Sequence, residues 1–180
     1  MKRTWLVSGA ALIFSAALGA TASSPPAQTP PATVKPARVP DPPVKDMTAE
    51  QEEKWAAETE ALVERACVSC HPIADITKVR KSWGDWNTTV ARMAALGIEA
   101  DEDQLTAVKL YMARYYGAVN VNKAGAAELS AVLGLSAKQA AAVTAYRDTH
   151  GEFADADALA KVEGIDKAKI ADAAEALRFK

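Results

Sequence analysis

Apolar side chains recur at helical spacing between residues 55 and 66 and predict a first helix. The preceding Thr48-Ala-Glu-Gln51 has the form of a capping box, in which the first and fourth side chains bond each other's backbone N–H groups. The predicted helix therefore begins at Thr48 and runs directly into Cys67. Its apolar face is made by Trp55, Leu62, Val63 and Ala66.

Two further amphipathic helices are predicted along the next part of the chain. They span Trp83–Leu96 and Asp101–Tyr116, and each is followed by a glycine of the kind that ends helices, Gly97 or Gly117. Three helices with apolar stripes can pack around one core, although so short a segment buries little apolar surface by itself. The positions in phase are Trp83, Trp86, Val90 and Met93, then Leu105, Val108, Met112 and Tyr115.

The C-terminal part contains a repeated break between helical patterns. Each break has the order apolar-Gly-apolar, at Val132–Ser136 and again at Val162–Asp166. Such a repeat predicts two helix–hairpin–helix units, in which Gly134 and Gly164 give the backbone freedom that a tight turn needs. A helix around Ala140–Arg147 is expected to end at His150-Gly151. Further core positions are expected at Leu135, Phe153, Leu159 and Ile165. The whole chain is therefore expected to be all-α.

The N-terminus has the pattern of a secretory signal. A basic start and an apolar run end at the small-residue sequence Ala20-Thr-Ala22, which predicts a signal peptide over residues 1–22 and no membrane span after cleavage. An uncleaved anchor is the alternative. Residues 23–47 form a Pro-rich linker, because eight of the nine prolines lie between 23 and 43. It is either an extended spacer or an unstructured arm.

The sequence Cys67-Val-Ser-Cys70-His71 carries the clearest chemistry. It is a C-x-x-C-H motif, in which two thiols can form thioethers to one haem and the adjacent imidazole can bind the iron. A structural zinc site would need four ligands, whereas the chain has only two Cys and two His. A disulfide between the cysteines is the remaining alternative, but it leaves His71 unexplained. One covalently attached haem c is the cofactor predicted.

The sixth iron ligand is expected to be a methionine or a histidine. Helical phase alone does not separate Met93 from Met112, whereas His150 is expected at the surface. The segment from Cys67 to Gly117 resembles a mono-haem cytochrome c domain of dehydrogenase-associated proteins. It shares the haem motif and the run Trp86-Asn-Thr-Thr-Val90-Ala-Arg92-Met93, with Gly97 soon after. That resemblance implies Met93 as the axial ligand and Met112 as a core residue.

Residues 118–180 resemble the tandem helix–hairpin–helix domain of competence-type DNA receptors. The shared residues include Val119–Asn122, Leu133-Gly-Leu135, Ala145-Tyr-Arg147, Gly151-Glu-Phe153 and Val162-Glu-Gly-Ile165. The resemblance implies the fold, and it implies hairpins whose backbone N–H groups hold a phosphate.

Two features disfavour nucleic acid as the partner. The hairpins of that family have a second glycine, which is Ser136 in one hairpin here and Asp166 in the other. The Asp166 carboxylate would repel a phosphate. Residues 118–180 carry eight Lys and Arg against nine Asp and Glu, so no basic surplus drives binding. A helical module that docks to another protein or packs on the preceding helices is the other interpretation.

Together these patterns predict a signal peptide (1–22), a Pro-rich linker (23–47), a cytochrome c-like domain (48–117) and a helix–hairpin–helix domain (118–180). The expected function is electron transfer in the periplasm, without enzyme activity, and the expected partner is a periplasmic redox protein such as a dehydrogenase or another cytochrome. The alternatives are an envelope DNA-binding protein with a haem adjunct and a haem sensor with an open iron site. Lys78, Arg80 and Lys81 form either a solvated loop or a contact to haem propionates or an acidic partner.

Overall fold

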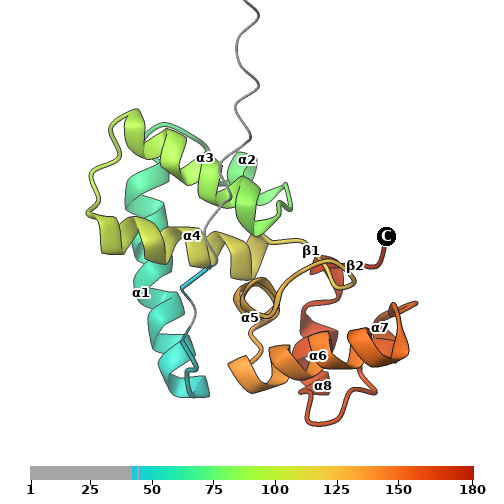
Figure 1. Ribbon diagram of the computed structural model, residues 1–180. Coiled ribbons are helices and arrows are strands. Elements are labelled where there is room, and N and C mark those ends of the chain that lie inside the picture. The colour runs from blue at the N-terminus through green and yellow to red at the C-terminus, as the bar shows by residue number, and fades with distance from the viewer. Residues whose placement is uncertain (1–41, 44) are drawn as a thin grey trace, which may run out of the picture. The chain divides into compact units, whose positions relative to one another are not determined.

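The computed structural model describes residues 42–43 and 45–180, so the predicted signal peptide and most of the predicted linker lie outside the described residues. The described part is almost entirely helical, as predicted (Figure 1). The elements in chain order are α1 (Ala49–Cys67), α2 (Ile73–Thr77), α3 (Trp83–Ala95), α4 (Glu102–Tyr116), β1 (Val119–Asn120), α5 (Ala126–Leu133), α6 (Ala137–His150), α7 (Ala156–Leu159), α8 (Lys167–Asp172), a 3-10 turn (Ala174–Ala176) and β2 (Leu177–Arg178).

The first three predicted helices are confirmed as α1, α3 and α4. Thr48 is the N-cap of α1, and its side chain and that of Gln51 form the predicted capping box. Asp101 and Gln104 form an equivalent box at the start of α4. Sequence patterning did not predict α2, a single turn between the Cys67–His71 motif and α3.

Helix α4 is the central element, because it contacts α1, α3 and α5. Its contacts with α1 and α3 enclose a first core (Figure 1). The buried residues of this core are Leu62, Val63, Trp86, Val90, Val108, Tyr111 and Met112.

The predicted apolar stripes of α3 and α4 differ from the structure at two positions. Trp83 is buried, but it packs in a second core with residues of the C-terminal segment rather than with Trp86 and Val90. Tyr115 is 39% exposed rather than part of the core. Ala113 of α4 also belongs to the second core, so both α3 and α4 pack against residues that follow position 117. The domain boundary at residue 117 stays a prediction.

The two predicted hairpins form as expected. Gly134 and Gly164 have φ values of 67° and 78°, in the left-handed region that favours glycine. The first hairpin joins α5 to α6 and the second leads into α8, and Leu135 is buried behind the first. Phe153 and Leu159 are buried as predicted, Ile165 packs against the same core, and α6 ends at His150.

A short parallel pairing that the sequence did not predict closes the C-terminal segment. Val119 of β1 lies opposite Leu177 of β2, and Asn120 lies opposite Arg178. The Asn122 side chain reinforces this closure by donating to the carbonyls of Phe153 and Phe179, at 2.9 Å each. Among the described residues, no helix has the length and apolar character that a membrane crossing requires.

Candidate functional site

The Cys67–His71 motif forms a tight turn at the end of α1. The Val68 N–H donates to the Glu64 carbonyl at 3.1 Å and closes the last helical turn. The N–H groups of Cys70 and His71 then donate to the Cys67 carbonyl, at 3.2 and 3.0 Å. This turn brings two sulfur atoms and one imidazole to the mouth of a single cavity.

The cavity has a volume of about 870 Å³, and all four predicted site residues line it: Cys67, Cys70, His71 and Met93. Its walls are largely apolar and come from α1, α2, α3, α4 and the loop after α3. The apolar lining residues are Leu62, Ala66, Ile76, Val79, Trp86, Val90, Leu96, Ile98, Val108 and Met112. This arrangement suits a large apolar group that is held by sulfur and imidazole.

The two candidate methionines differ in their surroundings, although both line the cavity. Met112 is 2% exposed and packs in the first core with Trp86, Val90 and Val108. Met93 is only half-buried and lies outside that packed cluster. Met93 therefore has the freer thioether, and Met112 has the contacts of an ordinary packing residue.

The three basic residues after the motif have separate roles. Lys78 pairs with Asp75 one helical turn earlier, and Arg80 pairs with Glu175 and donates to the Tyr115 carbonyl. Only Lys81 lines the cavity, with its Nζ atom 3.0 Å from Thr89 Oγ1 and 5.0 Å from the centre of the Trp86 ring.

Both cysteine thiols are free in the structure. Cys67 is half-buried at the end of α1, and this burial raises the pKa of its thiol. Cys70 is exposed. His150, expected at the surface, is exposed at the end of α6, where its ring stacks on Tyr146 with the ring centres 4.2 Å apart.

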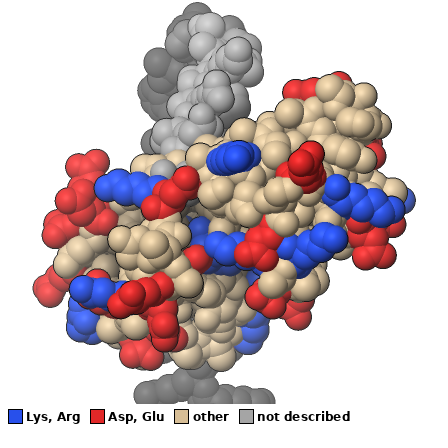
Figure 2. Space-filling view, turned by 90° about the horizontal axis from the view of Figure 1, so that it is seen from below, with Lys and Arg blue, Asp and Glu red and all other residues tan. Residues whose placement is uncertain are grey.

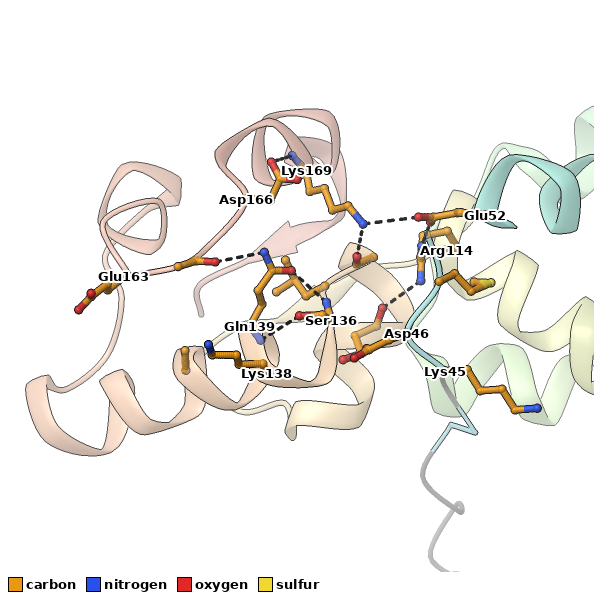
Figure 3. A pocket seen from close by; sticks show the side chains of 16 residues that line it. Lys45, Asp46, Glu52, Arg114, Ser136, Lys138, Gln139, Glu163, Asp166 and Lys169 are labelled. Atoms are coloured by element: carbon orange, nitrogen blue, oxygen red, sulfur yellow. Dashed lines mark hydrogen bonds and ion pairs between the residues drawn. The ribbon is translucent and has the colours of Figure 1, made fainter. Parts of the chain in front are cut away.

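A second hollow, the hairpin cleft, lies where the two hairpins meet the start of α1. It has a volume of about 430 Å³ (Figure 3). Two bonds join the hairpins across it. The Gln139 side chain donates to the Gly164 carbonyl at 3.1 Å, and Lys169 donates to the Gly134 carbonyl at 2.6 Å.

Arg114 holds the N-terminal helices against the first hairpin. Its guanidinium donates to the carbonyls of Ala131 and Ser130, at 2.8 and 3.1 Å, and pairs with Glu52 of α1. Burial lowers the pKa of Arg114, and the Glu52 carboxylate opposes this effect. A Cβ atom at Gly134 would lie 2.8 Å from Arg114 Nη1, so a side chain here would displace the end of that guanidinium, and the positive φ favours glycine independently.

The residues that replace the second glycine of each hairpin act as helix caps. Ser136 Oγ accepts from the Gln139 N–H at 3.2 Å. Asp166 Oδ1 accepts from the N–H groups of Ala168 and Lys169, at 3.0 and 3.3 Å. Both side chains thus occupy backbone donors at the positions where the hairpins of the DNA-receptor family would hold a phosphate.

Sequence reasoning did not assign Asp46, Glu52 or Arg114 to the hairpin cleft, which they line. Asp46 Oδ1 accepts from the Ala137 N–H at 2.8 Å, a contact between positions that lie 91 apart. Glu52 also lies 3.5 Å from Lys169 Nζ. Acidic residues before and within the first turn of a helix normally indicate helix capping alone, so the local sequence held no signal for these long-range contacts.

Charges of opposite sign are interspersed on the surface. In the face seen from below, Lys and Arg side chains alternate with Asp and Glu, and no broad area of one sign appears (Figure 2). The hairpin cleft is balanced in the same way, since four basic and four acidic side chains line it: Lys45, Arg114, Lys138 and Lys169 against Asp46, Glu52, Glu163 and Asp166.

Comparison with known proteins supports one of the two predicted parts. Residues 115–178 match the family model described as a helix-hairpin-helix motif. The C-terminal segment contains a helix–hairpin–helix unit. The chain is also similar to an uncharacterized protein of Haemophilus influenzae, with 43% identity over 53 residues, which are 29% of this chain and 47% of that protein. The match thus spans about half the length of that relative, and no solved structure matches the chain.

Proposed function

We propose that the protein is an electron carrier that holds one covalently attached haem c in the cavity beside Cys67. The observation that carries the proposal is that Cys67, Cys70, His71 and Met93 all line one cavity of about 870 Å³. Two thiols, an imidazole and a thioether are the donors that c-type haem uses. The cavity walls from α1, α3 and α4 are largely apolar, as a porphyrin requires. The fit therefore rests on donor chemistry and on the size and polarity of the cavity.

Each site residue has a separate role in this proposal. Cys67 and Cys70 would hold the haem through thioether bonds, His71 would bind the iron through its imidazole, and Met93 would supply a second iron ligand through its thioether. When bound, haem supplies a one-electron couple between ferrous and ferric iron, whose potential a methionine ligand raises relative to histidine. If His71 and Met93 both bound the iron, a substrate would have no free iron position, which favours a carrier over an enzyme.

The proposed location is the periplasm, because residues 1–22 have the pattern of a secretory signal. The proposed partner is a periplasmic redox protein, either a dehydrogenase or another cytochrome. The family match does not include the Cys67–His71 motif, so this proposal rests on the motif and the cavity alone.

The test is to express the full chain in a host that matures c-type cytochromes and to examine the purified protein. We expect a haem spectrum that stays with the chain after denaturation, and its loss in Cys67→Ser/Cys70→Ser. Ser69→Ala, which changes the residue between them, is the matched control and should keep the haem. Colourless wild-type protein with both thiols free would contradict the proposal.

The sixth ligand is tested in the same material. Met93→Ala should abolish the charge-transfer band of ferric iron bound by sulfur, whereas Met112→Leu should retain it, because Met112 is a packing residue. Ready binding of carbon monoxide by the reduced wild-type protein would instead favour a sensor with an open iron site.

Nucleic-acid binding in the cell envelope is the second candidate function, and the family match at residues 115–178 favours it specifically. The match supports this candidate more directly than it supports electron transfer. Titration of labelled duplex DNA with the full-length protein at low salt tests it. Binding that weakens steeply with added salt is the expected result, because counterion release drives phosphate contacts. The absence of binding at low salt, by the wild type and by variants that remove carboxylates from the hairpin cleft, would remove this candidate.

A further inference from the structure

Acidic side chains from the start of the described chain occupy the hairpin cleft. Asp46 Oδ1 accepts from the Ala137 N–H, the first of α6, at 2.8 Å. Glu52 pairs with Arg114 and lies 3.5 Å from Lys169 Nζ (Figure 3). Both residues lie far outside the helix–hairpin–helix match at residues 115–178.

The position taken by Asp46 is one that favours an anion. The free N–H groups and the dipole at the start of a helix attract negative charge, and phosphates commonly bind there. In this protein the chain itself supplies the anion, since a carboxylate already lies on the N-terminus of the 14-residue α6.

The cleft around this carboxylate gives a second, independent observation. Its volume is about 430 Å³, and it gathers basic side chains from separate elements. Lys138 is exposed at its edge, and Lys169 reaches in from α8. Their charge is balanced by the four carboxylates of the cleft, two of which, Asp46 and Glu52, come from outside the hairpins.

We propose that the hairpin cleft binds the phosphate backbone of nucleic acid and that Asp46 and Glu52 occupy it as competing anions of the same chain. This inference rests on the second candidate function. It explains why the Ala137 N–H and the Lys169 ammonium of a helix–hairpin–helix unit already meet carboxylates from outside that unit. Neutralising Asp46 and Glu52 leaves the cleft with two positive charges in excess.

The experiment compares duplex DNA binding by the wild-type protein, Asp46→Asn/Glu52→Gln and Glu50→Gln/Glu53→Gln, all as full chains at the same low salt. The last variant is the matched control, because it removes two exposed carboxylates of the same helical turn that do not line the cleft. Fluorescence anisotropy of a labelled duplex gives each Kd.

We expect Asp46→Asn/Glu52→Gln to bind about tenfold more tightly than the wild type and than the control. Adding Lys138→Gln to that variant should reduce the slope of log K against log salt by roughly 0.9, the loss of one phosphate contact. Asp46→Asn alone, which changes an exposed side chain ahead of α1, should give about a threefold gain and does not depend on the Glu52 contacts.

The outcomes separate the two levels of the proposal. If the wild type binds DNA and Asp46→Asn/Glu52→Gln gains no more affinity than the control, then Asp46 and Glu52 do not compete with DNA for the cleft. This competition, or masking, is then wrong, while the second candidate function stands. If no variant binds at low salt although circular dichroism shows each one folded, nucleic-acid binding and masking both fail. A gain in the cleft variants alone supports both.

Discussion

The two cysteines of the motif lie in different surroundings, and this difference is testable in haem-free protein. Burial raises the pKa of the Cys67 thiol, whereas Cys70 is exposed. Because the thiolate is the reactive form, we predict that Cys67 is alkylated more slowly than Cys70 at neutral pH and gains reactivity only at alkaline pH. Pulse alkylation followed by peptide mass spectrometry measures both rates. Faster labelling of Cys67 would contradict the structure around the end of α1.

Tyr111 predicts how stability changes at alkaline pH. Its ring is buried between Trp55, Tyr115 and Tyr116, and burial followed by the charge of Glu60 raises its pKa to about 12. In the unfolded chain a tyrosine titrates near pH 10, roughly. The folded state therefore holds this proton more tightly, and the resulting stability is present below about pH 10 and lost as the pH rises towards 12.

Tyr111→Phe should remove this contribution to the loss of stability at alkaline pH. Urea unfolding of both proteins at neutral pH and across the alkaline range measures the free energy of unfolding. We expect the difference between wild type and variant to shift in favour of the variant as pH rises. If the free energies of unfolding of the two proteins change with pH in parallel, the raised pKa of Tyr111 is contradicted.

At the scale of elements, the end of α4 depends on one close approach. A Cβ atom at Gly117 would lie 1.9 Å from the Ala113 carbonyl oxygen and 3.0 Å from Val132 Cγ1. Gly117→Ala should therefore destabilise the protein by roughly 1–3 kcal/mol, the usual cost of overpacking. Gly125→Ala is the control, because nothing lies within 4 Å of its Cβ position. Gly125 is the N-cap of α5, so alanine there should cost about 0.5–1 kcal/mol through weaker capping, with no overpacking. Equal unfolding free energies for the two variants would contradict this packing.

Helical periodicity predicted α1, α3 and α4 but not which core each face joins. The bounds of α1, α3 and α4 follow from caps and glycines, which are local signals. Trp83 is in phase with Trp86, yet it packs in the second core because α3 borders both cores. The pairing of β1 with β2 joins strands of two residues each from opposite ends of the C-terminal segment, and so short a strand leaves no period to detect.

The two candidate sites differ in whether local or long-range contacts build them. The turn at Cys67–His71 is local, so the spacing of its residues was enough to single them out as one candidate site. The hairpin cleft depends on Asp46 and Glu52, whose partners lie along α4, α6 and α8. Such contacts follow from tertiary packing, and the composition of residues 118–180 alone could not reveal them.

At the scale of the whole molecule, the two cores share α4. Its residues Val108 and Met112 line the cavity, whereas Ala113 packs in the second core and Arg114 pairs across the hairpin cleft. A single rigid helix thus presents one side to the candidate haem site and the other to the helix–hairpin–helix unit. We therefore expect the described part of the chain to unfold in one cooperative transition.

A fragment of residues 42–117 tests this expectation. Removing residues 118–180 exposes Trp83 and Ala113, which are 6% and 0% exposed in the intact protein. Burial of one large apolar side chain contributes roughly 1.5–3 kcal/mol, and a segment this short has little stability to lose. We predict that the fragment unfolds at a markedly lower temperature than the full chain when both are followed by circular dichroism in the same cofactor state. Two separate transitions in the full chain, one of them at the melting temperature of the fragment, would show instead that the parts are independent domains, as the predicted boundary after residue 117 implies.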